Sequence, residues 1–118
     1  MSLNFKKELV YEEKHMVIER FIECFAKSEK KLIWNNFIKR PRCFPFEQFN
    51  SLEINKSKNV YFYLERVDRL FITQLDCIKC YVDELEPWID IDAYVFDESM
   101  EWTVAITHED NKIFSTDS

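Results

Sequence analysis

The chain of 118 residues contains no glycine, and this absence limits both its turns and the sites it can build. Glycine is the usual residue for left-handed backbone and for a close approach of the main chain to a phosphate group. The sequence therefore excludes a Walker A loop, a GxGxxG dinucleotide turn and a GxSxG nucleophile elbow. Tight turns have to rely on asparagine, aspartate, serine and proline.

The first half of the chain has the apolar spacing of helices. Apolar residues recur at helical intervals through Val17–Phe25 and again through Leu32–Ile38, which predicts two amphipathic helices. The segment Leu9–Val10 fits the first helix or a short one before it. Pro41 follows the expected end of the second helix, and Pro45 suits the first position of a short third helix.

The second half is rich in the β-branched and aromatic residues that favour strands. Four strands are predicted, at Val60–Leu64, Leu70–Thr73, Ile89–Phe96 and Trp102–Thr107. The hairpin turn between the last two falls at Asp97–Met100, and it is longer than a two-residue Asn-Gly turn because no glycine is present. The stretch Gln74–Glu86 is ambiguous, with a short helix before Pro87 as one reading.

These elements predict a single α+β domain over residues 1–118. Its N-terminal helices pack on a mainly antiparallel sheet of about four strands. Along the last strand, alternation assigns Ile106 and Ala105 to opposite faces. Asp90 and Asp92 are two residues apart on the strand before it and so share one face, a pattern typical of a solvated sheet face.

Charge divides the chain unequally. Residues 1–82 hold 15 basic and 11 acidic residues, whereas residues 83–118 hold 1 basic and 11 acidic, for a net charge of −6 overall. The acidic third is interleaved with aromatic and aliphatic residues, so it is expected to fold rather than to form a disordered tail. It would repel the phosphates of a nucleic acid and attract a basic protein.

The expected location is the cytoplasm. The N-terminus has no apolar stretch of the kind that begins a signal peptide, and no stretch approaches the roughly 18 apolar residues needed to span a bilayer. We therefore expect neither secretion nor membrane insertion. The four cysteines are expected to be free thiols, as is usual in the cytoplasm.

Three groups of residues in the sequence have side chains that could carry chemistry. Cys77 and Cys80 form a CxxC pair, which resembles half of a zinc site or a redox motif but lacks further ligands, so packing is the favoured reading. His108–Asp110 sets an imidazole beside two carboxylates, as in a metal corner or an acid–base pair. The carboxylate pairs Asp90/Asp92 and Glu98/Glu101 are read as solvated rather than catalytic.

Four blocks of the sequence resemble the YxiF-like family, which consists of small bacterial proteins of unknown function. The blocks are Leu32–Phe37, Asn59–Tyr63, Asp92–Asp97 and Glu101–Glu109, within residues 15–110. The first block of the family reads Leu-Trp-His-x-Phe, and Asn35 stands here in place of the histidine, which weakens any metal or catalytic role for that block. Some members are encoded beside polymorphic toxins, so the resemblance implies an immunity role.

The sequence thus favours an acidic protein-binding module, of the immunity type, that occludes a basic partner such as a toxin. The residues predicted to contact the partner are Asp83, Glu84, Glu86, Trp88, Asp90, Asp92, Asp97, Glu98 and Glu101. No catalytic residue, metal site or cofactor is predicted. Two alternatives stay open: a small metal-dependent enzyme that uses His108, Glu109 and Asp110, and a structural homo-oligomer that pairs through exposed strand edges. The oligomeric state is not predicted.

Overall fold

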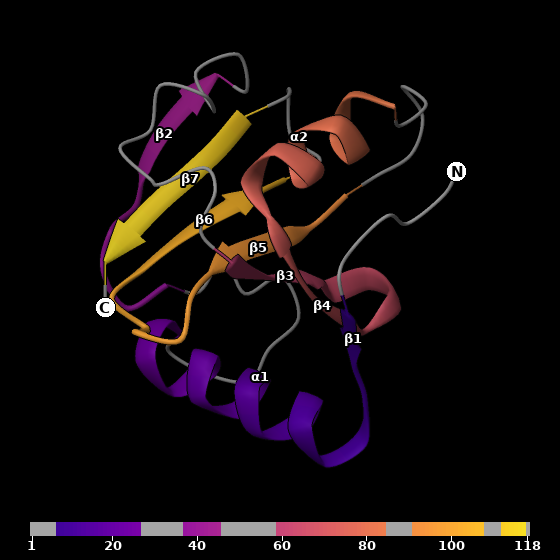
Figure 1. The fold of residues 1–118 in the computed structure, drawn as a ribbon. Coiled ribbons are helices and arrows are strands. Elements are labelled where there is room, and N and C mark those ends of the chain that lie inside the picture. The colour runs from indigo at the N-terminus through magenta and orange to yellow at the C-terminus, as the bar shows by residue number, and fades with distance from the viewer. Residues whose placement is uncertain (1–6, 27–36, 46–58, 85–90, 108–111, 118) are drawn as a thin grey trace.

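The computed structural model describes residues 7–26, 37–45, 59–84, 91–107 and 112–117 (Figure 1). Within them the chain forms a seven-stranded sheet, two α-helices and one short 3-10 helix. In chain order these elements are β1 (Lys7–Leu9), α1 (Tyr11–Phe25), β2 (Arg42–Pro45), β3 (Asn59–Leu64), η3 (Glu65–Val67), β4 (Arg69–Gln74), α2 (Leu75–Asp83), β5 (Ala93–Phe96), β6 (Trp102–Ile106) and β7 (Lys112–Asp117).

The strands lie in the order β1-β4-β3-β5-β6-β7-β2, and every neighbouring pair is antiparallel. The prediction of an α+β fold with a mainly antiparallel sheet is confirmed. The predicted number of about four strands is wrong, because β1, β2 and β7 extend the sheet at both ends. The four predicted strands form its centre, as β4, β3, β5 and β6.

The N-terminal half departs most from the prediction. The helix predicted through Val17–Phe25 is present as α1, but Leu9 belongs to strand β1. Pro45 ends strand β2 instead of starting a helix, which is compatible with proline because β2 is an edge strand. The predicted helix through Leu32–Ile38 and the one after Pro45 fall largely outside the described residues.

One face of the sheet packs against α1 (Figure 1). Phe21, which is fully buried on α1, stacks on Phe96 of β5 with ring centroids 4.3 Å apart and tilts against Tyr94 at 5.3 Å. The chain returns to this core after α1, since the Ile38 N–H donates to the Phe25 carbonyl at 2.8 Å. This return leads the chain toward the β2 edge.

The opposite face packs against α2 (Figure 1). The predicted short helix before Pro87 is therefore confirmed, as α2, and it buries Leu75 and Ile78 against the sheet. Alternation along the strands assigns residues to the two cores as expected, with Ile106 in the α2 core and Ala105 in the α1 core.

A sheet covered on both sides leaves little of its central strands exposed. All four residues of β5 are buried, and so are four of the five residues of β6. In the part of the chain that the structure describes, the exposed side chains therefore lie mainly on the helices, the turns and the edges and ends of the sheet. Among the described residues, neither helix is long and apolar enough to cross a membrane.

Candidate functional site

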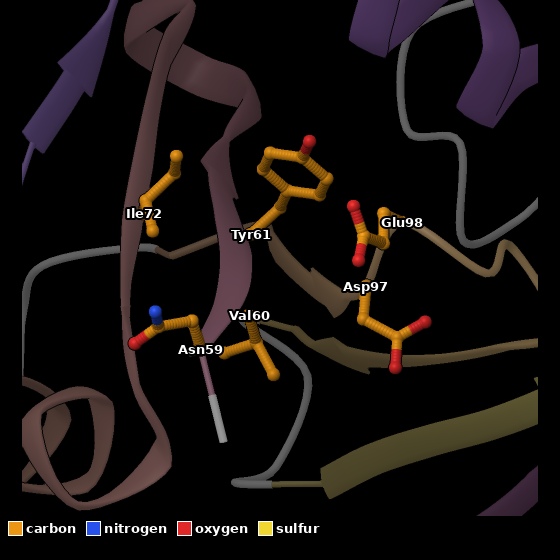
Figure 2. Close-up of a pocket in the computed structure, with 6 residues that line it drawn as sticks. All are labelled: Asn59, Val60, Tyr61, Ile72, Asp97 and Glu98. Atoms are coloured by element: carbon orange, nitrogen blue, oxygen red, sulfur yellow. The ribbon is translucent and has the colours of Figure 1, made fainter. Parts of the chain in front are cut away.

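A small pocket lies at one end of the sheet, between β3, β4 and the turn that follows β5 (Figure 2). Its lining residues are Asn59, Val60, Tyr61, Ile72, Asp97 and Glu98. Its volume is about 230 Å³, below the roughly 300–1,000 Å³ of pockets that take drug-sized ligands. We call it the β5–β6 notch. Its size suits a single side chain better than a cofactor.

The pairing register explains which side chains line the notch. Asn59 and Tyr61 are two residues apart on β3 and so share one face. Tyr61 lies opposite Ile72 of β4 and opposite Phe96 of β5. Because β5 ends at Phe96, the next residues turn beside Tyr61, and Figure 2 shows the Glu98 carboxylate on the side of the Tyr61 ring. Tyr61 and Ile72 pack against the α1 core, so the notch belongs to that face of the sheet.

Asp97 shapes the turn between β5 and β6. Its Oδ1 accepts hydrogen bonds from the Ser99 backbone N–H at 3.0 Å and from the Ser99 hydroxyl, and its Oδ2 accepts one from Trp102 Nε1 at 3.2 Å. The Met100 N–H donates to the Asp97 carbonyl at 3.1 Å. Met100 has φ of 55°, the left-handed backbone that glycine usually supplies. Asp97 is only 2% exposed, so its carboxylate builds the turn and does not face a partner.

Charges from separate parts of the chain converge on Tyr61. Burial raises the pKa of the Tyr61 phenol, and the negative charge of Glu98 raises it further. Arg20 on α1 lowers the same pKa, and Glu13 raises it slightly. Among the described residues neither Glu98 nor Arg20 forms an ion pair. The notch therefore has an exposed carboxylate, Glu98, beside an aromatic ring. The positive charge of Arg20 acts on the same ring with a smaller effect than Glu98.

Asp92 does not lie on a solvated sheet face, contrary to the sequence-based expectation. Its side chain is fully buried, and its Oδ2 accepts a hydrogen bond from Arg66 Nε at 2.7 Å within an ion pair. The Glu65 N–H donates to the Asp92 carbonyl at 3.0 Å. The physical reason is that Asp92 immediately precedes β5 at the sheet end that η3 covers, where its charge is matched by Arg66. Asp92 is a structural carboxylate.

Four of the remaining predicted residues lie in the described part of the chain, as two exposed pairs. Asp83 and Glu84 are exposed at the end of α2, where Asp83 pairs with Lys79 at 3.5 Å. Glu98 and Glu101 are exposed in the β5–β6 turn. The helix α2 packs on one face of the sheet, whereas Met100 of the turn packs into the core on the other face.

The described carboxylates thus form two pairs, one at the end of α2 and one in the β5–β6 turn. Three further predicted residues lie outside the described residues: Glu86, Trp88 and Asp90.

The other candidates for chemistry gain no support in the described part of the chain. Cys77 is partly buried and Cys80 is exposed on α2, and both are free thiols. No group of three or more histidine, cysteine, aspartate or glutamate side chains that could hold a metal ion occurs among the described residues. The segment His108–Asp110 lies outside them. His15 is on the surface of α1, where its Nε2 lies 3.1 Å from Glu19.

Sequence reasoning identified Asp97 and Glu98 but missed Asn59 and Tyr61. The sequence predicts Tyr61 as part of the strand Val60–Leu64 and Asn59 as the end of the polar loop before that strand. The spacing of Asn59 and Tyr61 could have indicated the site, because side chains two residues apart at the end of a strand point to the same face of the sheet. Finding the notch also required the pairing of β3 with β5, which the sequence did not provide.

No protein-family model matches the chain, and neither a curated protein nor a solved structure matches it. The resemblance to the YxiF-like family therefore stays a prediction.

Proposed function

We propose that the chain is a protein-binding module that captures a basic protein at the β5–β6 turn, in the manner of an immunity protein that occludes its toxin. One observation carries the proposal. At the β5–β6 notch the exposed Glu98 carboxylate stands beside Tyr61 and makes no ion pair within the described residues. A carboxylate placed in this way is ready to pair with a cation from outside the chain.

The charge distribution supports the same function. Between Lys79 and Lys112 the chain has no lysine or arginine, so the turn sits within a long stretch without positive side chains. Glu101 adds a second exposed carboxylate to the turn. Such a surface attracts a basic partner over distance and speeds its association, with an effect that salt weakens.

The predicted family resemblance adds a biological setting to this chemistry. If the chain is an immunity protein, its partner presents a basic surface, such as the phosphate-binding cleft of a nuclease. The acidic turn would then cover that cleft in place of the phosphates.

The experiment is affinity capture of basic proteins from the cells that make the chain, at low and at high salt. We expect a basic protein to be retained near 0.1 M salt, where the screening length is about 10 Å, and released near 1 M, where it is about 3 Å. The partner is identified by mass spectrometry and its direct binding is then measured with purified protein.

Two variants of equal charge test where the partner binds. The turn variant carries Glu98→Gln and Glu101→Gln, and the helix variant carries Asp83→Asn and Glu84→Gln. Each removes two negative charges, so net charge alone affects both equally. We expect the turn variant to lose at least about tenfold in affinity, since paired contacts to a charged group are individually worth on the order of 1 kcal/mol. Equal losses in both variants would show that the turn is not the site.

A further inference from the structure

We infer that the β5–β6 notch is a receptor for one arginine side chain of the partner protein, which stacks its guanidinium on Tyr61 and pairs it with Glu98. This inference rests on the proposed function, and it specifies which group of the partner enters the chain. It is carried by the size of the notch, by its mixture of aromatic and acidic groups, and by the charges around it.

The size of the notch fits a single side chain. The volume of about 230 Å³ is too small for most cofactors but ample for a side chain with three methylene groups and a flat head. The aliphatic side chain of Ile72 lies on its wall, on the same face of the sheet as Tyr61. This apolar group suits the methylene stem of a guest, because long cationic side chains bury their stems on apolar surface while the charged head reaches a polar group.

The polar groups of the notch are arranged for a cation. The Tyr61 ring and the Glu98 carboxylate lie side by side in the view of Figure 2, and the negative charge of Glu98 raises the pKa of the Tyr61 phenol. A cation over the ring gains from the quadrupole of the π-system. The same cation can donate to the neighbouring carboxylate.

Arginine fits these groups better than lysine does. Its guanidinium is flat, so it can lie against a ring face and at the same time donate two parallel hydrogen bonds to a carboxylate in the plane. A lysine ammonium is compact and strongly hydrated, so it gives up more water and offers no flat surface. The carboxylate of Asp97 is already saturated by the turn, which leaves Glu98 as the anionic group for the guest.

Arg20 and Glu98 carry opposite charges near the notch, so removing each charge should change the binding of a cationic guest in opposite directions. The positive charge of Arg20 acts on Tyr61 from α1, and it therefore disfavours a second cation in the notch. Removing the charge of Arg20 should strengthen binding of a guest, whereas removing the charge of Glu98 should weaken it. Both side chains are exposed, so neither change is expected to disturb the fold.

The test titrates the ¹⁵N-labelled full chain with blocked arginine, N-acetyl-arginine methylamide, and follows backbone and Asn59 side-chain amides by NMR. We expect saturable shifts confined to residues 59–61 and 97–99. Relative to the unchanged chain, Glu98→Gln should weaken binding about threefold to fivefold and Arg20→Gln should strengthen it by a similar factor. Glu84→Gln is the matched control, because it makes the same change on an exposed glutamate at the end of α2, which does not line the notch.

Two further probes define the guest. Blocked lysine should bind more weakly than blocked arginine, and blocked citrulline, which keeps the shape but loses the charge, should not bind measurably. Equal binding of arginine and citrulline would overturn the inference, and so would equal binding of arginine and lysine. Shifts spread over the whole surface without saturation would overturn it as well.

The inference and the proposed function can fail separately. If a basic partner is captured through the turn but blocked arginine does not bind in the notch, the inference is wrong and the function stands. If blocked arginine binds as described but no basic partner depends on Glu98 and Glu101, the notch is a cation receptor and the proposed function is wrong.

Discussion

Thr73 and Thr103 are both fully buried in the sheet, but their hydroxyl groups differ. Thr103 Oγ1 donates to the Val95 carbonyl at 3.0 Å, whereas Thr73 Oγ1 has no hydrogen-bond partner in the described part of the chain. A buried polar group without a partner costs about 1–3 kcal/mol of stability. The two threonines therefore form a matched pair in which the same substitution should have opposite effects.

Replacing Thr73 with valine should raise the free energy of unfolding by about 1 kcal/mol, because valine keeps the shape and removes the unpaired hydroxyl. Replacing Thr103 with valine should lower it by about 0.5–1.5 kcal/mol, since a formed hydrogen bond is lost. Urea denaturation of both variants measures the difference. Shifts of the same sign in the two variants would contradict this account.

The left-handed positions show how single residues take over the role of glycine. Tyr11, Asp68 and Met100 have φ between 52° and 55°. Aspartate tolerates this conformation better than most residues, and Asp68 also accepts hydrogen bonds from Lys14 Nζ at 3.0 Å and from the Tyr63 hydroxyl at 3.1 Å. Met100 is anchored by burial. At two of the three positions, side-chain contacts thus offset a backbone conformation that costs about 1–2 kcal/mol.

At the scale of elements, one ion pair adds to the backbone pairing that attaches β1 to the sheet. β1 has only three residues, and it pairs with β4 alone. Arg69 Nε and Nη2 donate to the two carboxylate oxygens of Glu8 at 3.1 and 2.8 Å, and the guanidinium lies 5.0 Å from the centre of the Phe71 ring. The hydrogen bonds from Arg69 lower the pKa of Glu8 below its ordinary value of 4.5.

This lowered pKa predicts a pH-dependent difference between the natural chain and Glu8→Gln. Because the folded state holds Glu8 ionised more strongly than the unfolded state does, the pair stabilises the fold above pH 4.5, the ordinary value. The contribution is lost as the pH falls through the lowered pKa. The natural chain should be the more stable of the two near neutral pH, with the gap shrinking as the medium becomes strongly acidic.

Urea midpoints of the two proteins across this pH range make the measurement. The double variant Glu8→Gln/Arg69→Gln should show little further pH-dependent loss beyond the single changes, because one interaction has been removed. A gap that stays constant from neutral to acidic pH would contradict the assignment.

The elements that could be predicted are those with a strong pattern of their own. The strands β3 to β6 are rich in aromatic and β-branched residues, and α1 shows helical spacing over several turns. The segments Lys7–Leu9 and Arg42–Pro45 have no such pattern, and in Lys112–Asp117 the pattern is limited to Ile113, Phe114 and Thr116. They become strands because a neighbouring strand offers unpaired backbone groups, and this long-range pairing overrides their weak local preference.

Only those parts of the candidate site that depend on neighbouring residues in the sequence could be predicted. Composition predicts the turn at Asp97–Met100, and charge predicts Glu98 as a residue that contacts a partner. The sequence does not predict the burial of Asp92, because its partner Arg66 lies 26 positions away. Tyr61 likewise required the register of β3 against β5. Alternation assigned faces correctly, but it cannot tell whether a face is open to water or covered by a helix.

At the scale of the whole molecule, one sheet supports two cores. Phe21 and Leu70 belong to the core beneath α1, whereas Ile78 and Val95 belong to the core beneath α2. Both cores share the same central strands, so neither can lose its packing without disturbing the strands that support the other. This arrangement favours a single cooperative unfolding transition.

Leu70→Ala and Ile78→Ala test the coupling of the two cores. Both side chains are fully buried, and each truncation should lower the free energy of unfolding by about 2–5 kcal/mol. Unfolding followed by far-ultraviolet circular dichroism and by tryptophan fluorescence should give coincident curves in both variants. Curves that separate in either variant would show that the two faces melt independently.

The strand order also determines when each strand can pair during translation. β2 lies at an edge of the sheet, and its neighbour is β7, which follows every other described strand in the chain. A ribosome therefore releases β2 early, and β2 has to wait unpaired while nearly all the other elements are translated. The sheet cannot be completed on the ribosome before β7 has emerged from the exit tunnel. In such a topology the final assembly step is a contact between distant parts of the chain, which is slow to form and leaves an open strand exposed to other nascent chains until it does.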